Sequence, residues 1–151
     1  MLDSYLFIPG NKDKFLNKML DLQPDYFVVD LEDSVSQHEK KEALKKVLVR
    51  EFKSNTFFRI PYLEDSYTKQ ELIDLSIKSK GKIVLPKVRN LADVDSVMSI
   101  LESSKKIQLI VLVENPECLL NIKEILSKYG THIHAVGFGS HDFCSETGIK
   151  H

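Results

Sequence analysis

Charged side chains in this sequence gather just after short apolar runs. The segment 30–33 (DLED), Glu114 and Asp142 supply carboxylates, while Arg59 and Lys87 supply cations. Carboxylate oxygens suit magnesium, which commonly takes one or two of them and keeps water or substrate oxygens at its other positions. A guanidinium offers a planar fork to a carboxylate and stays charged at any working pH. If the fold brings them together, these residue types could bind a metal ion and an acidic small molecule.

The apolar runs that precede these residues have the composition of buried strands. Six of them lie at residues 5–8, 26–29, 56–60, 83–85, 109–113 and 133–138. Near-continuous apolar runs, rather than strict alternation, are typical of strands covered on both faces. The segments between the runs carry apolar residues at helical spacing. These are Phe15, Met19 and Leu22; Ala43, Leu44, Val47 and Leu48; Leu72, Ile73, Leu75 and Ile77; Val94, Val97, Met98 and Leu101; and Leu119, Ile122, Ile125 and Leu126.

Alternating strands and helices predict one α/β domain over residues 1–151, with a parallel sheet and right-handed crossovers. Both a doubly wound open sheet and a (β/α)8 barrel fit this periodicity, although a barrel typically needs about 250 residues. In either fold, sites are assembled at the carboxyl ends of the strands, where the charged residues fall. A solvated rim would also be polar, so position alone leaves both interpretations open.

Composition excludes several classes of protein. The 151 residues carry a formal net charge of -1, with lysines and acids interleaved, so no basic stripe is available for a nucleic acid. No apolar run approaches the length of a membrane span, and the N-terminus lacks the features of a secretion signal. Cys118 and Cys144 stand in unrelated contexts, as expected for reduced thiols in a cytoplasmic protein.

Six ordered segments resemble the citrate lyase beta-subunit family of the metal-dependent aldolase/citrate lyase superfamily. They are residues 4–11 (SYLFIPGN), 30–35 (DLEDSV), 58–60 (FRI), 85–87 (LPK), 113–116 (VENP) and 137–143 (GFGSHDF). Each lies at an expected strand end, and the resemblance covers residues 4–148. It implies a (β/α)8 TIM-barrel type of fold. About six βα units are present, so the last two are expected to be missing from this chain.

The resemblance also implies roles for individual residues. Glu114 and Asp142 match the magnesium ligands, and Arg59 matches the arginine that grips the substrate carboxylate. Glu32 and Asp33 match an acidic pair that borders the metal and its waters. The alternatives are a helix-start acid at Glu114 and an ordinary capping or loop acid at Asp142. For the acidic pair the alternative is a surface position for one member, and for Arg59 it is a side chain that extends to solvent or pairs with Asp30.

Weaker expectations concern the substrate. Lys87 is expected to contact substrate, to support the carboxylate cluster, or to form a structural ion pair. Gly10 and Asn11 open the first expected helix, where the resemblance places a thioester or phosphate-bearing group such as coenzyme A. Because backbone donors at a helix start favour anions, both residues are candidate substrate contacts. A Pro-Gly turn followed by an asparagine cap explains them equally well.

The sequence departs from the family pattern at three positions. Asp3 stands where many relatives carry a basic residue, Pro61 where an asparagine is common, and His141 where a glutamate precedes the metal-binding aspartate. The metal ligands are unaffected, and the departures bear on the substrate and on coenzyme A dependence. His141 is either a new catalytic acid/base group or a polar wall residue. His132 and His134 have strand spacing and are expected to form a partly exposed structural pair.

The resulting hypothesis is a magnesium-dependent carbon–carbon lyase or aldolase acting on a 2-oxo acid or a hydroxyacyl thioester, with the metal and Arg59 stabilising an enolate. A non-catalytic binding or scaffold piece of the same fold is the alternative, and a phosphoenolpyruvate-type enzyme is more distant. Open strand edges in a six-unit barrel predict a homo-oligomer. Small-molecule partners are expected, with no nucleic acid and no membrane.

Overall fold

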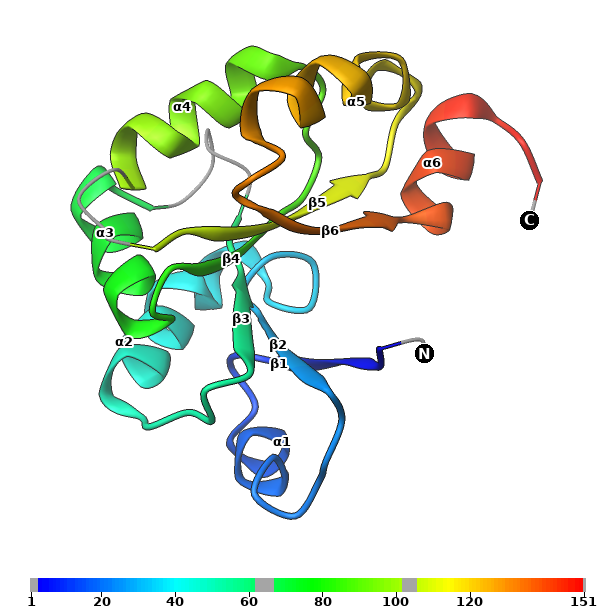
Figure 1. The fold of residues 1–151 in the computed structure, drawn as a ribbon. Coiled ribbons are helices and arrows are strands. Elements are labelled where there is room, and N and C mark those ends of the chain that lie inside the picture. The colour runs from blue at the N-terminus through cyan, green and yellow to red at the C-terminus, as the bar shows by residue number, and fades with distance from the viewer. Residues whose placement is uncertain (1–2, 62–66, 102–105, 151) are drawn as a thin grey trace.

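The computed structural model describes residues 3–61, 67–101 and 106–150, so the ends of the predicted domain, residues 1–2 and 151, lie outside the described residues. Six strands form one parallel sheet whose spatial order follows the chain order (Figure 1). They are β1 (Tyr5–Pro9), β2 (Tyr26–Asp30), β3 (Thr56–Arg59), β4 (Lys82–Leu85), β5 (Gln108–Val113) and β6 (Ile133–Phe138). All six expected strands are confirmed. A doubly wound sheet is wrong, because its strand order would reverse.

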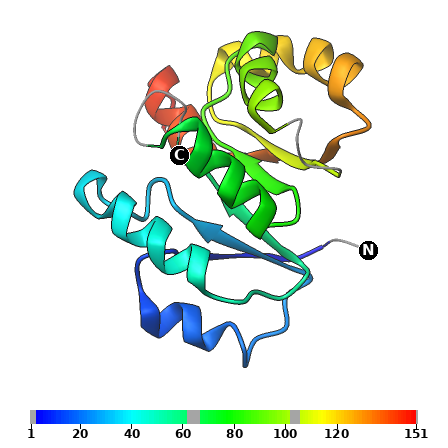
Figure 2. The same cartoon turned by 90° about the vertical axis from the view of Figure 1, so that its left-hand side faces the viewer.

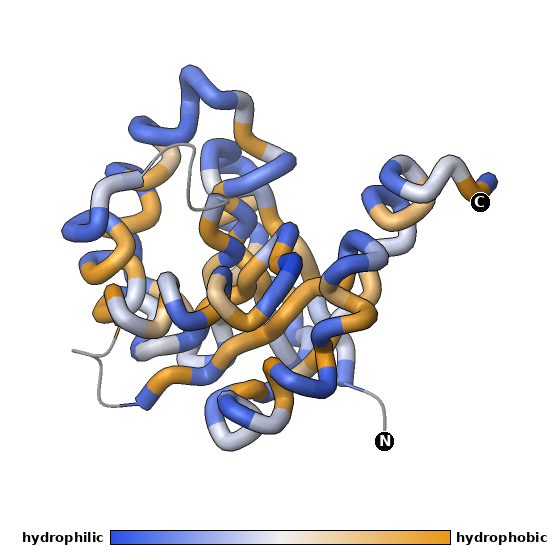
Figure 3. The backbone as a smooth tube through the Cα atoms, turned by 90° about the horizontal axis from the view of Figure 1, so that it is seen from above, coloured by the Kyte–Doolittle hydropathy of each residue, from blue (hydrophilic) through white to orange (hydrophobic). Residues whose placement is uncertain are grey.

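Helices follow the strands and pack on the outer face of the sheet (Figures 1 and 2). They are α1 (Asp13–Lys18), the 3-10 helix η1 (Gln37–Glu39), α2 (Lys40–Val49), α3 (Lys69–Lys78), α4 (Leu91–Leu101), α5 (Pro116–Tyr129) and α6 (Ser140–Thr147). Leu44, Leu75 and Val94 bury their side chains against strand residues in the main core. Seen from above, hydrophobic residues concentrate along the central strands (Figure 3). Within the described ranges, no helix is both long and apolar enough to span a bilayer.

The opposite face of the sheet is concave and carries its own cluster of strand residues. Its buried members are Val28, Phe57, Val84, Ile110 and Leu112. Tyr5 of β1 and His134 of β6, which belong to the two outermost strands, approach across this face with 3.1 Å between Tyr5 Oη and His134 Nε2. The sheet therefore curls into a half-barrel that opens on the side where both termini lie (Figure 1).

Some details of the expected helices are wrong. Helix α1 begins at Asp13, and it is Leu16 and Met19 that are buried, whereas Phe15 is 44% exposed. In α5 the buried positions are Cys118 and Ile125, each one residue before an expected core leucine. The expected positions Met19 and Ile125 are confirmed as buried, whereas Phe15 and Leu119 are exposed and their neighbours Leu16 and Cys118 are buried in their place. The direction in which a helix leaves its strand decides which of two adjacent residues meets the sheet.

The two strand-spaced histidines contact different partners. His132 lies edge-on to Tyr129 of α5, whereas His134 packs among Tyr5, Tyr26 and Phe57 on the concave face. Both side chains are partly buried, as expected. Their separate contacts show that they do not act as a pair.

Candidate metal and substrate site

The site begins with an ion pair between adjacent strands. Asp30 and Arg59 are register partners at the carboxyl ends of β2 and β3. Arg59 Nε and Nη2 each donate to one Asp30 oxygen at 2.7 Å, while Asp30 also accepts from the backbone N–H groups of Glu32 and Ser34. Burial acts to raise the pKa of Asp30, but the Arg59 guanidinium outweighs it and holds that pKa below its usual value. The alternative in which Arg59 pairs with Asp30 is therefore present in the structure.

The remaining guanidinium nitrogen faces the acidic pair. Arg59 Nη1 lies 3.2 Å from oxygens of both Glu32 and Asp33. Lys87 Nζ approaches the same two carboxylates, at 2.6 Å from Glu32 and 3.1 Å from Asp33. Glu32 is buried, and mainly for that reason, helped by the neighbouring Asp33 carboxyl, its pKa rises to about 7. A carboxyl group with such a pKa can hold or release a proton near neutral pH.

Lys87 connects this cluster to Glu114. Its backbone adopts the left-handed conformation, with φ of 53°, which is uncommon for a residue other than glycine. In this conformation its backbone N–H donates to Glu114 Oε2 at 2.8 Å, while its side chain turns to Glu32 and Asp33. Strained backbone of this kind persists only where the surroundings enforce it, and it clusters at functional sites.

Glu114 follows β5 and is almost completely buried, at 4% exposure. Burial is the main cause that raises its pKa, and Asp142 and Asp33 add to it. Its Oε2 accepts from the Lys87 N–H, and its second oxygen, Oε1, lies on the side of Gly139. Asn115 caps α5 by accepting from Cys118 N–H at 2.8 Å and donates to the Val88 carbonyl. One oxygen of this buried carboxylate is therefore fixed by a backbone donor, and the carboxylate is a candidate ligand for a cation.

Asp142 lies in the first turn of α6, next to this carboxylate. Together with Lys87, Arg89, Glu114 and Asn115 it lines a hollow of about 270 Å³. His141 is on the exposed side of the same turn, and it does not line this hollow or the larger one described below. Its catalytic role stays a prediction.

The backbone of Gly10 is used within the sheet, and the side chain of Asn11 is buried. Gly10 N–H donates to the Asp30 carbonyl at 2.8 Å, which extends the β1–β2 ladder and uses the donor expected to meet an anion. The N-cap of α1 is Lys12, so an asparagine cap is wrong. The buried Asn11 amide has no hydrogen-bond partner among the described residues. Substrate contact by these residues stays a prediction.

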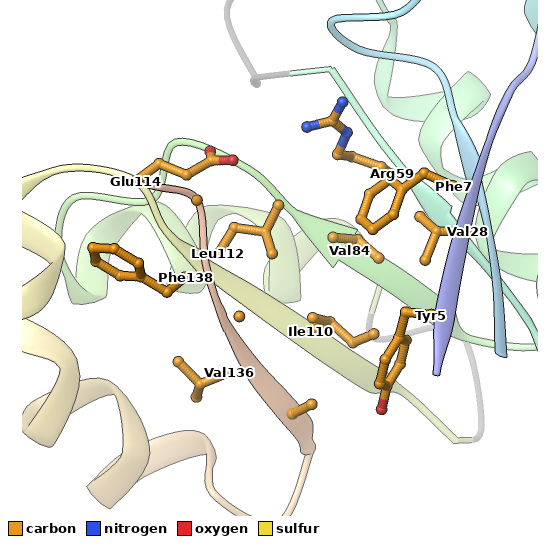
Figure 4. Close-up of a pocket in the computed structure, with 13 residues that line it drawn as sticks. Tyr5, Phe7, Val28, Arg59, Val84, Ile110, Leu112, Glu114, Val136 and Phe138 are labelled. Carbon is orange, nitrogen blue, oxygen red and sulfur yellow. The ribbon is translucent and has the colours of Figure 1, made fainter. Parts of the chain in front are cut away.

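A larger hollow of about 380 Å³ opens on the concave face (Figure 4). Arg59 and Glu114 stand at one end, and apolar side chains such as Phe7, Val84 and Leu112 line the rest. Apolar side chains beside fixed charges lower the local dielectric, so the electrostatic interactions of Arg59 and Glu114 are stronger here than in bulk water.

The charge balance of the cluster suits a divalent cation. Its ionisable groups are the cations Arg59 and Lys87 and the carboxylates Asp30, Glu32, Asp33, Glu114 and Asp142. With all carboxyls ionised, the formal excess is three negative charges. In the described part of the chain, no three His, Cys, Asp or Glu residues form a metal-binding group. Two carboxylates that leave the other positions to water or substrate fit magnesium.

Sequence reasoning missed two organising residues. The sequence indicates Asp30 only as a possible partner of Arg59, whereas in the structure Asp30 also accepts hydrogen bonds from the backbone N–H groups of Glu32 and Ser34. Gly139 was not singled out, yet it lies against Glu114. The position of Asp30 at a strand end could have indicated its importance, whereas the packing of Gly139 has no signal in a single sequence.

Comparison with known proteins identifies the family. The family model described as HpcH/HpaI aldolase/citrate lyase matches residues 3–151. The chain belongs to this family. Two curated relatives are a (3S)-malyl-CoA thioesterase from Cereibacter sphaeroides and an L-malyl-CoA/beta-methylmalyl-CoA lyase from Rhodobacter capsulatus. The first is 29% identical and the second 26%, over 98% and 95% of this chain. These matches cover 52% and 50% of the relatives, so the chain spans about half of their length.

Solved structures of the family share the fold. The Mycobacterium tuberculosis protein CitE in complex with magnesium and acetoacetate matches with a TM-score of 0.79 at 20% identity, over 99% of this chain and 59% of CitE. A citrate lyase beta subunit from the same organism, complexed with oxaloacetate and magnesium, matches with a TM-score of 0.78 at 21% identity, over 97% of this chain and 62% of that one. The half-barrel is therefore an arrangement found in these larger proteins.

Proposed function

We propose that this chain forms the magnesium-binding part of a carbon–carbon lyase that acts on a 2-oxo acid or a hydroxyacyl thioester. The observation that carries the proposal is the state of Glu114. This carboxylate is buried, one of its oxygens is held by the Lys87 N–H, and Asp142, in the first turn of α6, lines the same hollow. The six strands are proposed to belong to a (β/α)8 barrel, in which the carboxyl ends of the strands carry the active site.

Glu114 and Asp142 would hold the metal ion. When bound, magnesium supplies Lewis-acid stabilisation of the negative charge that develops on a substrate oxygen as the carbon–carbon bond breaks. Arg59 adds a positive charge at the same end of the hollow, where Asp30 keeps its guanidinium oriented. Glu32 is placed to hold or release a proton on the Arg59 and Lys87 side of the cluster. The roles of Asp33 and His141 in proton transfer remain part of this proposal.

The chemistry of the relatives supports the substrate class. Two of them are named for malyl-CoA, and the similar solved structures hold acetoacetate, oxaloacetate or coenzyme A. Acetoacetate and oxaloacetate each carry a carboxylate and an oxo group, and malyl-CoA carries a carboxylate and a hydroxyl group, all of which are oxygen donors for a magnesium ion. The excess negative charge of this site would repel a substrate carboxylate. Such a substrate would therefore bind through its carboxylate and a neighbouring oxygen only when the metal is present.

The decisive experiment measures metal binding before activity. We expect calorimetric titration with magnesium to show one site in the unmodified chain, and oxaloacetate or pyruvate to bind only in the presence of magnesium. Asp142→Asn should abolish the metal signal, because it removes one of two charged ligands. Asp95→Asn, which changes an exposed carboxylate paired with Lys128 on another surface, is the matched control. Equal magnesium binding by the Asp142 variant and the control would contradict the proposed site.

A further inference from the structure

Gly139 lies where β6 ends and α6 begins, between the two proposed metal ligands. Its N–H donates to the Val113 carbonyl at 3.0 Å, directly before Glu114, and so continues the β5–β6 ladder. Its own carbonyl accepts from Phe143 N–H at 3.0 Å, which starts the helix that carries Asp142. One residue is thus hydrogen-bonded to the strand end of one ligand and to the helix of the other.

The α-carbon of Gly139 also touches the Glu114 side chain. A Cβ atom built on Gly139 would overlap Glu114 Cγ and would stand 2.9 Å from Oε1. Real Cβ atoms do not approach other atoms so closely, so any larger residue would force the Glu114 side chain to turn away. The backbone itself is not the obstacle, because φ of -88° at this position is open to alanine.

Glu114 is therefore enclosed between two backbone groups. The Lys87 N–H holds Oε2 at 2.8 Å, and the bare α-carbon of Gly139 bounds the side of Oε1. A shift of the carboxylate away from Gly139 would disturb the Lys87 hydrogen bond, since the side chain is buried and has little room to adjust.

We infer that Gly139 is the positioning residue of the metal site: its missing side chain keeps Glu114 on the Lys87 N–H with Oε1 presented to the cation, while its carbonyl anchors the helix of Asp142. The inference rests on the proposed function for the identity of the cation. The placement of Glu114 by Gly139 does not depend on it, and it can be tested in the metal-free protein.

The test compares Gly139→Ala with Gly137→Ala. Gly137 lies on β6, two residues before Gly139, and a Cβ there would meet only the end of the flexible Leu112 side chain, at 2.7 Å. We expect Gly139→Ala to speed hydrogen exchange of the Lys87 amide without metal and to weaken magnesium binding by roughly 10- to 100-fold, as for residues that orient a ligand. Gly137→Ala should retain both properties. With Glu114→Ala already present, Gly139→Ala should change neither the amide exchange nor the residual metal affinity.

Three outcomes decide the inference. Unchanged hydrogen exchange of the Lys87 amide and unchanged magnesium affinity in Gly139→Ala would overturn the inference. An equal loss of magnesium affinity when Gly139→Ala is added to Glu114→Ala would also overturn it.

If Gly139→Ala alone does not fold, the double variant with Glu114→Ala should fold, because the overlap between the two side chains is then removed. A double variant that also fails to fold would overturn the inference. If the unmodified chain binds no magnesium, the proposed function fails, while the Lys87 amide still decides whether Gly139 positions Glu114.

Discussion

At the scale of single residues, the site depends on cations that satisfy more than one carboxylate. Asp30 takes two donors of Arg59, and Lys87 divides its backbone and its side chain between Glu114 and the acidic pair. A substrate carboxylate would meet an Arg59 whose Nε and Nη2 already donate to Asp30. The arginine therefore acts more as a fixed charge than as a free fork.

The raised pKa of Glu32 has a consequence for stability. Its pKa is raised from 4.5 to about 7, chiefly by burial, so between these values the folded chain binds more protons than the unfolded chain. The free energy of unfolding contributed by Glu32 therefore falls as the pH rises through this window. The lowered pKa of Asp33 acts below 3.8, outside the window. Glu32→Gln should remove the Glu32 share of this pH dependence and leave that of Glu114, whose pKa burial also raises. Relative to the unmodified chain, the variant should therefore become more stable by about 1–3 kcal/mol as the pH rises from 4.5 to 8.

Urea denaturation at several pH values measures this difference. Glu51→Gln, at a side chain that is 98% exposed, controls for the substitution itself. A difference between Glu32→Gln and the unmodified chain that stays constant from pH 4.5 to pH 8 would show that Glu32 is not held in its neutral form by burial.

At the scale of elements, the side chain of Asn115 fixes the junction of β5 and α5. Asn115 is 4% exposed, caps α5 and also donates to the Val88 carbonyl at 2.9 Å. It thereby joins the segment after β4 to the strand end that carries Glu114. Asn90 caps α4 by accepting from Ala92 N–H, but this hydrogen bond is exposed.

We expect Asn115→Ala to lower the free energy of unfolding by about 2–4 kcal/mol, because it removes a cap and leaves a buried carbonyl without a donor. Asn90→Ala should cost about 1 kcal/mol, as an ordinary cap does. Urea denaturation of the two variants gives the comparison. Equal losses would show that the Val88 hydrogen bond adds nothing to the cap.

The elements themselves were predictable to a greater degree than the site. Each strand lies within one residue of its expected bounds, because continuous runs such as 109–113 leave few alternatives. The order of charged residues at strand ends placed Glu114, Asp142 and Arg59 near one another. The side-chain geometry was beyond reach, since the left-handed Lys87 and the contact of Gly139 with Glu114 depend on packing between distant segments.

At the scale of the whole molecule, the half-barrel exposes apolar surface on its concave side. Phe7 on β1 is 44% exposed, and Val136 and Phe138 on β6 are 43% and 61% exposed. Within the described sheet, β1 and β6 each pair on one side only. Unpaired strand edges next to apolar side chains favour association with another chain.

The 151-residue chain is therefore expected to self-associate at micromolar concentrations, because association covers the concave face and both edges. Phe138→Lys should shift the equilibrium toward monomer, since a charge would be buried in the interface. Leu120→Lys is the control, because Leu120 is 83% exposed on α5, away from the concave face. Sedimentation velocity over a range of concentrations measures the effect, with circular dichroism to establish that the variants fold. An unmodified chain that stays monomeric at every concentration would show that the open half-barrel tolerates its exposed face. An equal shift toward monomer in Phe138→Lys and Leu120→Lys would show that association depends on exposed apolar side chains in general and not on the edge strand β6.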